Sequence, residues 1–314
     1  MPGVDVTRVT DDSGDLYGKR YFTERNPEKY GFPDLKTRAR TDLPERCSHW
    51  LRTILKYKVP PATVLELGAA HGGHVALLRW AGYDATGLEL SPWLVEFARQ
   101  TFGVPMLQGP LADQELKRGS LDVIALMDVL EHLPSPADTI RRCFDLLKPD
   151  GIVVVQTPRY PEAVTYEAMI AGSNPFLAQL KADEHVYLFS HQAIREFFSR
   201  IGVCEINFEP AIFAHYDMFF VASRVAPTIQ SAREIEATLA ASPRGRVIQA
   251  LIDTHSQLRE AERDRAERLK ILETQHQILS AFPVRALVYC LRRLKLLPLS
   301  SPQGASMPDR SNGR

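Results

Sequence analysis

The sequence of 314 residues has no excess of charge, because 38 lysines and arginines balance 38 aspartates and glutamates. Nucleic-acid-binding proteins usually display a surplus of basic residues, so we expect no nucleic-acid partner. The sequence also contains no run of 18 uninterrupted apolar residues, which a transmembrane helix needs. Its first 15 residues are polar and acidic, unlike a secretory signal. These absences predict a cytoplasmic protein.

Closely spaced cysteines are absent as well. The four cysteines lie far apart in the sequence, at Cys47, Cys143, Cys204 and Cys290. Zinc sites and redox centres use close pairs, so we predict neither and expect buried, reduced thiols. Glycine is missing from the long charged stretch between residues 246 and 281, which favours a continuous helix there.

Short β-rich runs alternate with helical patterns between residues 61 and 226. This alternation is typical of a parallel sheet with crossover helices, so we predict an α/β fold with a mostly parallel seven-stranded sheet and helices on both faces. The predicted strands are Thr63–Leu67, Ala85–Leu90, Pro105–Gln108, Leu121–Met127, Ile152–Thr157, Cys204–Glu209 and Met218–Ser223. The predicted helices between them are His74–Trp80, Pro92–Phe102, Pro136–Leu147 and His191–Ile201.

Helical segments are predicted on both sides of this domain. Residues 1–60 contain a helix from Arg38 to Tyr57, which we expect to pack beside the sheet. Residues 227–298 form a charged helical arm, and residues 299–314 form a Ser-, Pro- and Gly-rich tail that we predict to be disordered. A weak coiled-coil pattern in the arm, interrupted by two charged residues, comprises Leu258, Leu269, Leu272 and Leu279. A homodimer through the arm and a solvated arm both remain open.

A basic amphipathic helix is predicted near the end of the arm, from Val284 to Leu297. Its apolar face comprises Val284, Leu287, Val288, Leu291 and Leu294, and its basic residues are Arg285, Arg292, Arg293 and Lys295. Such a helix can lie on an anionic membrane, or it can be buried against the same protein or a partner. Peripheral membrane contact and protein contact are therefore both open.

A glycine-rich loop follows the first predicted strand. Glu66 near the end of that strand leads into Gly68-Ala69-Ala70-His71-Gly72, and glycines at such a place let backbone N–H groups approach a ligand. A dinucleotide-binding loop would require glycine at Ala70. The spacing Glu-x-Gly-x-x-x-Gly instead resembles the first motif of class I S-adenosylmethionine-dependent methyltransferases. This resemblance implies that Gly68 and Gly72 hold the amino-acid end of the cofactor S-adenosyl-L-methionine, beside Glu66.

Four further segments resemble this family in the same order, over residues 17–223. Glu89, with Leu90 after it, ends the second strand where a carboxylate would hold the ribose diol. Gly109 lies in the loop on the adenine side, although the acidic residue of that loop is displaced to Asp113. Asp128 follows the fourth strand, and residues 147–151 resemble the turn before the fifth. The resemblance implies a Rossmann-like fold and a further cofactor contact from Asp128.

Two histidines are the candidate general bases. If the acceptor is a hydroxyl group, a base assists its deprotonation, and histidine titrates in the useful range. His132 follows Asp128 in the loop after the fourth strand, and His185 lies in a His-aromatic-Ser type of segment before a later helix. We name His132, His185 and Asp128 as the catalytic candidates. The Asp-x-x-Glu-His pattern also resembles the Glu-x-x-Glu-His segment of ubiquinone-biosynthesis O-methyltransferases, which has been associated with a divalent cation. We nevertheless predict no metal.

The segment Tyr17-Gly18-Lys19-Arg20-Tyr21-Phe22 resembles bacterial methyltransferases of sugar and cell-surface glycan pathways. This resemblance implies that Tyr21 contacts the cofactor and that the acceptor is a sugar, a glycan or another small molecule, with the insertion between Arg159 and Phe189 as a cap. A quinone or phenol O-methyltransferase is the first alternative. A non-catalytic scaffold with the same fold is the second.

Overall fold

The structure is a computed structural model that describes residues 17–25, 28, 31, 33–181, 184–280 and 282–294, without the side chains of residues 25 and 282–285. The chain forms two compact units, Met1–His255 and Ser256–Arg314. The first unit contains the sheet and the second contains helices.

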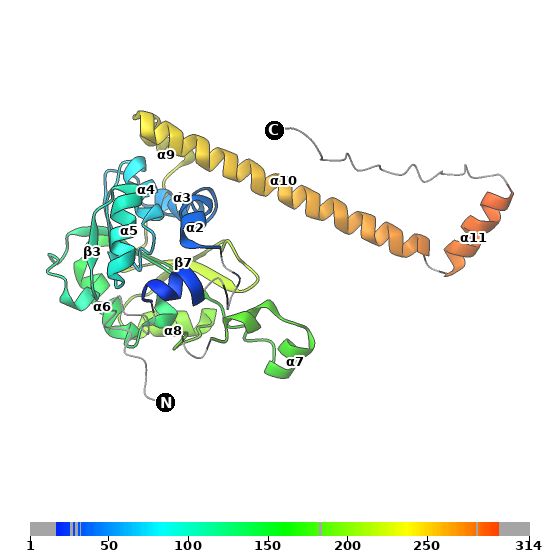
Figure 1. Cartoon of the computed structure of the whole chain (residues 1–314), viewed down its shortest axis with the longest axis horizontal. Coiled ribbons are helices and arrows are strands. Elements are labelled where there is room, and N and C mark those ends of the chain that lie inside the picture. Colours follow the sequence, from blue (N-terminus) through cyan, green and yellow to red (C-terminus); the bar gives the residue numbers. More distant parts are fainter. Residues whose placement is uncertain are drawn as a thin grey trace. The chain divides into compact units, whose positions relative to one another are not determined.

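The first unit is built on one seven-stranded sheet with the order β3-β2-β1-β4-β5-β7-β6 (Figure 1). Strands β3, β2, β1, β4 and β5 are parallel to one another, whereas β7 pairs antiparallel with both β5 and β6. The strands are β1 Thr63–Leu67, β2 Asp84–Glu89, β3 Met106–Gln108, β4 Leu121–Met127, β5 Leu147–Pro158, β6 Glu205–Glu209 and β7 Asp217–Ser223. The predicted Rossmann-like α/β fold is confirmed.

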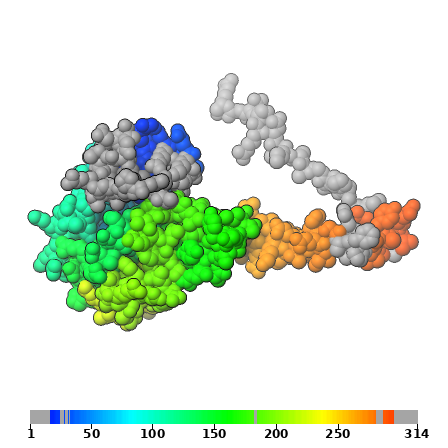
Figure 2. All heavy atoms as spheres, turned by 90° about the horizontal axis from the view of Figure 1, so that it is seen from below, coloured from blue at the N-terminus to red at the C-terminus, as the bar shows by residue number. Residues whose placement is uncertain are grey.

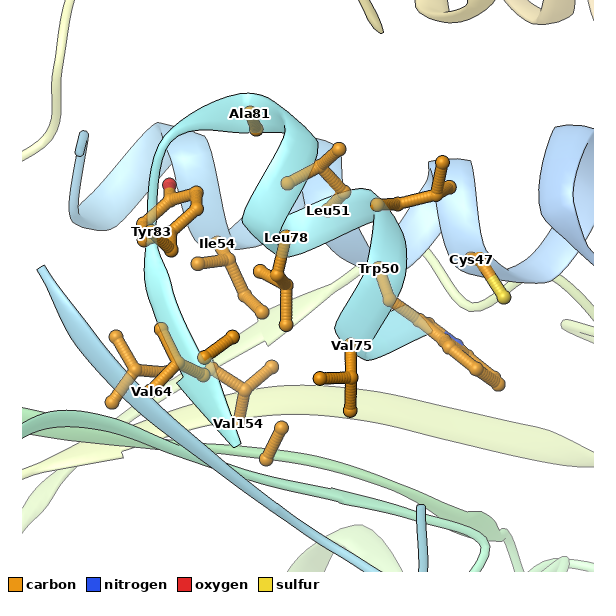
Figure 3. Packing of buried hydrophobic residues seen from close by; sticks show 14 of the residues in the cluster. Cys47, Trp50, Leu51, Ile54, Val64, Val75, Leu78, Ala81, Tyr83 and Val154 are labelled. Carbon is orange, nitrogen blue, oxygen red and sulfur yellow. The ribbon is translucent and has the colours of Figure 1, made fainter. Parts of the chain in front are cut away.

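Helices cover both faces of the sheet, and alternate strand residues pack against each layer. Val64 belongs to a core with α3, α4 and α5, whereas its neighbour Leu65 belongs to a second core with α6 and α8. Figure 3 shows Trp50 and Ile54 of α3 near Val75 of α4 in the first core. The helices of the first unit are α2 Leu35–Thr41, α3 Ser48–Tyr57, α4 Gly73–Ala81, α5 Pro92–Phe102, α6 Pro136–Leu146, α7 Tyr166–Ala171, α8 His191–Arg200 and α9 Ala232–Ala240.

The N-terminal helix expected from Arg38 to Tyr57 is divided into three pieces. Helix α2 ends at Thr41, a π-helical turn spans Leu43–Cys47, and α3 follows. Proline at the start of this turn has no N–H group, so the hydrogen-bond pattern of α2 cannot continue through it. The turn closes instead with the Cys47 N–H donating to the Asp42 carbonyl oxygen at 2.9 Å.

The compact first unit extends beyond residue 226, where we expected the sheet domain to end. Helix α9 starts with a capping box between Ser231 and Glu234. Leu239 of α9 and Ile248 of α10, which spans Pro243–Ser280, are buried in the first core. The boundary therefore lies within α10, between His255 and Ser256.

The second unit contains the rest of α10 and helix α11, Phe282–Arg293. Figure 2 shows the atoms of this part of α10 (orange) as a narrow column. The leucines of the weak coiled-coil pattern are between 49% and 59% exposed: Leu258, Leu269, Leu272 and Leu279. Coiled-coil pairing and a homodimer therefore stay predictions. Residues 295–297 of the basic helix and the predicted disordered tail, 299–314, lie outside the described residues.

None of the described helices is long and apolar enough to cross a membrane. Among the cysteines, Cys47 and Cys143 are buried as expected, but Cys204 and Cys290 are exposed. All four are free thiols.

Candidate functional site

A cavity of about 580 Å³ opens beyond the carboxyl ends of strands β1, β2, β3 and β4. Ligands of open α/β sheets bind at this edge, because the loops after the strands converge there. The predicted site residues that line it are Tyr21, Glu66, Gly68, Glu89, Leu90, Gly109, Asp128, His132 and His185. Residues from the whole length of the first unit therefore meet in one place, although Gly72 and Asp113 are not among the lining residues.

Gly68 lies where no larger residue fits. Its φ angle is +67°, and a Cβ atom there would lie 2.5 Å from Cγ2 of Val129. Its N–H group donates to the Leu88 carbonyl oxygen at 2.8 Å, which ties the loop to the end of β2. Glycine at this position therefore lets the loop pack against Val129 and form the floor of the cavity.

Gly72 has a packing role in the structure, and its predicted contact with the cofactor stays a prediction. Its φ angle is +78°, and an added Cβ atom would lie 2.7 Å from Cβ of Ala98 in α5 and 3.1 Å from Val104. The glycine allows α4 to start directly from the loop while α5 packs closely behind it. This position lies on the protein side of the loop rather than the cavity side.

Glu66 presents an unsatisfied carboxylate oxygen in a buried position. Its Oε1 atom lies 3.0 Å from Nδ1 of His74, whereas its buried Oε2 atom has no hydrogen-bond partner within the described residues. A buried polar atom without a partner costs roughly 1–3 kcal/mol. Because Glu66 also lines the cavity, a ligand that brings a hydrogen-bond donor to this oxygen would offset that cost.

Glu89 is held in place by three backbone N–H groups. Its Oε1 atom accepts from Leu90 and Ser91 at 2.8 and 3.0 Å, and its Oε2 atom accepts from Ala70 at 3.0 Å. Burial raises the pKa of Glu89, although these hydrogen bonds oppose the increase. The carboxylate is therefore fixed at the end of β2, and each oxygen still has lone-pair capacity for a ligand hydroxyl group.

The π-helical turn of the N-terminal segment is attached to the glycine-rich loop, a contact that sequence reasoning missed. The Gly73 N–H donates to Nδ1 of His71 at 3.0 Å, so the other ring nitrogen, Nε2, carries the proton that it donates to Asp42 at 3.2 Å. Burial opposes ionisation of Asp42, but the His71 hydrogen bond and the charge of Arg38 lower its pKa. Arg38 and Arg46 thereby reach the cavity lining.

Asp128 follows β4 in a left-handed backbone conformation, with a φ angle of +57°. The Gln156 amide donates to its Oδ1 atom at 2.9 Å, and the Trp50 indole N–H donates to the Gln156 amide oxygen at 2.9 Å. The Arg46 guanidinium lies 3.6 Å from the Oδ2 atom. Two buried side chains therefore fix the orientation of this carboxylate toward the cavity.

His132 and His185 lie together, with ring centroids 4.9 Å apart. Nδ1 of His132 lies 2.7 Å from the Glu184 carbonyl oxygen. A carbonyl oxygen only accepts, so Nδ1 carries the proton and Nε2 has the free lone pair. Burial lowers the pKa of His132, and burial together with the neighbouring His132 lowers the pKa of His185 to about 4. Both imidazoles are therefore neutral at neutral pH.

The N-terminal segment and the insertion after β5 cover this end of the cavity together. The Tyr21 hydroxyl donates to Oε2 of Glu184 at 2.9 Å, and the Tyr17 hydroxyl lies 2.9 Å from Nδ1 of His132. The Glu131 carbonyl oxygen accepts from the N–H group of Val186 at 2.8 Å. Three segments that are far apart in the sequence therefore meet around the histidine pair.

Glu131, His132 and His185 offer side-chain atoms that all lie within 4.8 Å of one another. This set could hold a divalent cation, whereas Asp128, which sequence reasoning associated with such a cluster, is not part of it. Glu131 is almost fully buried, and its Oε2 atom accepts from the Thr157 hydroxyl at 2.9 Å. Burial, with the charge of Asp128, raises the pKa of Glu131 well above its usual range.

Asp217 is a second cavity residue that the sequence did not reveal. It is the first residue of β7, is 5% exposed and lines the cavity. Burial and the neighbouring charge of Asp128 raise its pKa to about 8. Asp217 starts an antiparallel strand rather than following a parallel one, so no motif marks it.

The sequence comparisons identify the family. A family model described as a methyltransferase domain matches residues 39–203, which is just over half of the chain. The chain is a class I S-adenosylmethionine-dependent methyltransferase. The match includes the loops after β1, β2, β3 and β4 and therefore most of the cavity lining.

Several curated relatives of the methyltransferase are named ubiquinone biosynthesis O-methyltransferases. The Xanthomonas campestris protein is 28% identical over 46% of this chain and 66% of its own length. The Bordetella avium protein is 30% identical over 40% of this chain and 54% of its own length. The chain thus spans no more than two thirds of the length of these relatives.

Solved structures similar to the methyltransferase also carry methyltransferase names. A SAM-dependent methyltransferase from Thermotoga maritima has a TM-score of 0.45 and 16% identity, and the match covers 66% of this chain and all of that one. A phosphoethanolamine N-methyltransferase from Haemonchus contortus, in complex with S-adenosyl-L-methionine, has a TM-score of 0.46 and 14% identity, over 58% of this chain and 52% of that one.

Proposed function

We propose that the methyltransferase transfers a methyl group from S-adenosyl-L-methionine to a hydroxyl group of a sugar, a surface glycan or a related small molecule. The observation that carries the proposal is the pair of neutral, half-buried imidazoles, His132 and His185, in the cavity of a methyltransferase domain. A neutral imidazole in a covered site can accept the hydroxyl proton.

The cofactor would occupy the side of the cavity formed by the loops after β1, β2 and β3. The unpaired Oε2 atom of Glu66 suits the ammonium group of its amino-acid end, and Arg46 offers a cation for the carboxylate. Glu89 would accept hydrogen bonds from the ribose hydroxyls, and the segment from Gly109 to Ala112 would lie beside the adenine. The residues present therefore fit the cofactor.

The other side of the cavity would hold the acceptor and manage its proton. When bound, S-adenosyl-L-methionine supplies a methyl carbon with a sulfonium leaving group. On the acceptor side, Nε2 of His132 would take the proton of the hydroxyl group that receives the methyl group. The Glu184 carbonyl oxygen stabilises the resulting imidazolium through the Nδ1 proton. The tyrosine cover excludes water from this step.

Polar groups around the histidines support an acceptor with several hydroxyl groups. Asp217 has a pKa near 8, so it is protonated at neutral pH and can both donate and accept a hydrogen bond. Asp128 lies 3.6 Å from the Arg46 guanidinium, and Tyr17 adds a phenolic hydroxyl. An acceptor with hydroxyl groups on more than one carbon could satisfy these groups together, whereas a flat apolar ring would leave some of them unpaired.

A quinone or phenol acceptor is the second candidate. It is favoured by the names of the curated relatives, which are ubiquinone biosynthesis O-methyltransferases. Their low identity and partial coverage do not transfer their substrate to this chain. Asp128 and the tyrosine cover could serve either acceptor. A comparison of methyl transfer to the two classes of acceptor distinguishes them.

The test has two stages. Calorimetry with S-adenosyl-L-methionine should show binding to the wild-type protein, and Glu89→Ala should weaken it severely; absence of binding would overturn the proposal. Methyl transfer from labelled cofactor is then compared for a panel of sugars and sugar nucleotides and for a panel of catechols. Faster transfer to catechols would replace the glycan assignment with the phenol one. Methyl transfer to sugars by the wild-type protein, and its loss in His132→Ala, would support the glycan assignment.

A further inference from the structure

We propose that helix α11 binds the surface of an anionic lipid membrane through the face formed by Leu287, Leu291 and Leu294. This inference goes beyond the proposed function and concerns a part of the chain outside residues 39–203, which the family model matches. It rests on the exposure of an apolar face and on the charge of the segment around it.

The apolar face of α11 is open within the described residues. Leu287 is 58% exposed and Leu294 is 67% exposed, although the sequence spacing of seven residues is typical of a buried helix face. Leu291 lies between them, one helical turn from each. Tyr289, 63% exposed, lies on the opposite side of the helix, where the Arg293 guanidinium packs over its ring. The other described residues of the second unit therefore leave both leucines exposed.

The segment that contains α11 has charge of one sign. From Thr274 to Pro308 the sequence has no aspartate or glutamate, and its basic residues are Arg285, Arg292, Arg293 and Lys295. The whole chain, in contrast, has equal numbers of acidic and basic residues. Each lysine or arginine near an anionic leaflet increases affinity about fivefold. A one-sided charge next to an apolar face is the combination that anionic membranes select.

The exposed part of helix α10 in the same unit differs from α11 because its charges are mixed. Its exposed leucines are separated by residues of both signs, such as Glu262, Arg263, Asp264 and Arg265. Mixed charges suit water or a protein, and an anionic membrane would repel half of them. Helix α11 has 12 residues, about 18 Å, which is shorter than the hydrocarbon core of a bilayer. It would therefore lie in the plane of the surface.

The experiment is co-sedimentation of the full chain with vesicles. Vesicles of phosphatidylcholine with phosphatidylglycerol should bind the wild-type protein, and pure phosphatidylcholine vesicles should bind it at least about tenfold more weakly. Leu287→Asp combined with Leu291→Asp should abolish binding. Arg292→Ala combined with Arg293→Ala should weaken it about 30-fold and reduce its sensitivity to salt.

Leu258→Asp combined with Leu272→Asp in α10 is the matched control and should leave vesicle binding unchanged. Circular dichroism and calorimetry with S-adenosyl-L-methionine establish that each variant is folded. The inference is overturned if the anionic vesicles do not bind, if both kinds of vesicle bind equally, or if the α10 variant loses binding as the α11 variant does. It is also overturned if light scattering shows an oligomer that Leu287→Asp with Leu291→Asp dissociates, because the face would then be a protein interface.

Discussion

The two sides of the cavity are built in different ways. The side formed by the loops after β1, β2 and β3 depends on backbone conformation and on contacts that are close in sequence, such as Ala70 with Glu89. The side around the histidines depends on contacts between distant residues: Tyr17 with His132, Tyr21 with Glu184 and Trp50 with Gln156. A substitution at a single backbone position, such as Gly68, therefore disrupts the first side. The second side depends on side chains that can be removed one at a time.

This difference suggests a division of tasks. Loops with glycine and fixed carboxylates suit a ligand of constant structure such as a cofactor. Side chains supplied by an N-terminal segment and by an insertion suit a ligand that differs among relatives. We therefore expect substitutions on the first side to change cofactor affinity, and substitutions on the second to change turnover or acceptor affinity.

The largest effect on binding or turnover is expected for Gly68→Val. Its side chain would meet Val129, because even a Cβ atom would lie 2.5 Å from Cγ2 of that residue, and the φ angle of +67° disfavours a β-branched residue. We expect affinity for S-adenosyl-L-methionine to fall about 1,000-fold or more, equivalent to about 4 kcal/mol. Calorimetry measures this.

Gly103→Val is the matched control for Gly68→Val. Its φ angle is +64°, so it has the same backbone strain, but nothing lies within 4 Å of an added Cβ atom. We expect a loss of about 1 kcal/mol in the free energy of unfolding and no change in cofactor affinity. If both variants lost affinity equally, the clash with Val129 in the floor of the cavity would not explain the effect of the substitution at Gly68.

His132→Ala should have the next largest effect, on the second side. Removal of a general base lowers turnover about 100- to 1,000-fold, and cofactor affinity should stay within about threefold of the wild type. Turnover with the acceptor found by screening measures the effect. Because burial lowers the pKa of His132, the wild-type rate should not decline as pH falls through the ordinary histidine value of 6.5. A rate that halves at that pH would contradict this environment.

His185→Ala is the companion variant. If it lowers turnover more than His132→Ala does, the proton acceptor is His185, and His132 positions it through the ring contact. Equal, small losses in both variants would assign catalysis to the alignment of the two substrates alone.

Sequence reasoning found the first side of the cavity more completely than the second, for a physical reason. Strand periodicity and the glycine-rich loop locate Glu66, Gly68 and Glu89 because their contacts are local, and the parallel order of the strands brings the loops together. It did not reveal that Gly72 packs against Ala98 of α5, because a glycine that allows packing and a glycine that admits a ligand look the same in a sequence.

On the second side, the sequence indicated His132, His185 and Tyr21 only through resemblance to known families. Asp217 and Gln156 carry no local pattern. Asp217 reaches the cavity because β7 pairs antiparallel with β5, and Gln156 is held beside Asp128 because the Trp50 indole of α3 donates a hydrogen bond to it. Such contacts depend on tertiary packing, which periodicity does not reveal.

Asp217→Asn should change how stability depends on pH. The folded pKa of Asp217, about 8, is above its ordinary value of 3.8. The folded state therefore holds a proton that the unfolded state releases, and the wild-type protein loses stability as pH rises from about 4 to about 8. The asparagine variant lacks this loss. Its advantage in free energy of unfolding should grow across this range to about 6 kcal/mol and then level off.

Urea titrations of both proteins at several pH values measure the difference. An advantage that does not change with pH would show that Asp217 is ionised in the folded cavity. The same result would weaken the argument that this side of the cavity offers a neutral hydrogen-bond donor to the acceptor.

Gln156→Leu tests whether Asp128 must be held in position. The substitution removes the amide that donates to Asp128 and leaves the Trp50 indole N–H without its acceptor. We expect turnover to fall about tenfold, since a hydrogen bond to a charged group contributes about 1.5 kcal/mol or more. Trp50→Phe keeps a ring and removes only the indole donor, so its loss should be smaller. Unchanged turnover in Gln156→Leu would show that the orientation of Asp128 does not matter.

Tyr21→Phe is expected to have the smallest effect and sharpens the comparison most directly. It keeps the ring that packs against Tyr17 and Phe22 but removes the hydrogen bond to Glu184 that joins the N-terminal segment to the insertion. A hydrogen bond of this kind contributes about 1 kcal/mol, so KM for the acceptor should rise about fivefold while kcat changes little. An increase confined to KM for the cofactor would move Tyr21 to the first side of the cavity, where the sequence resemblance originally placed it.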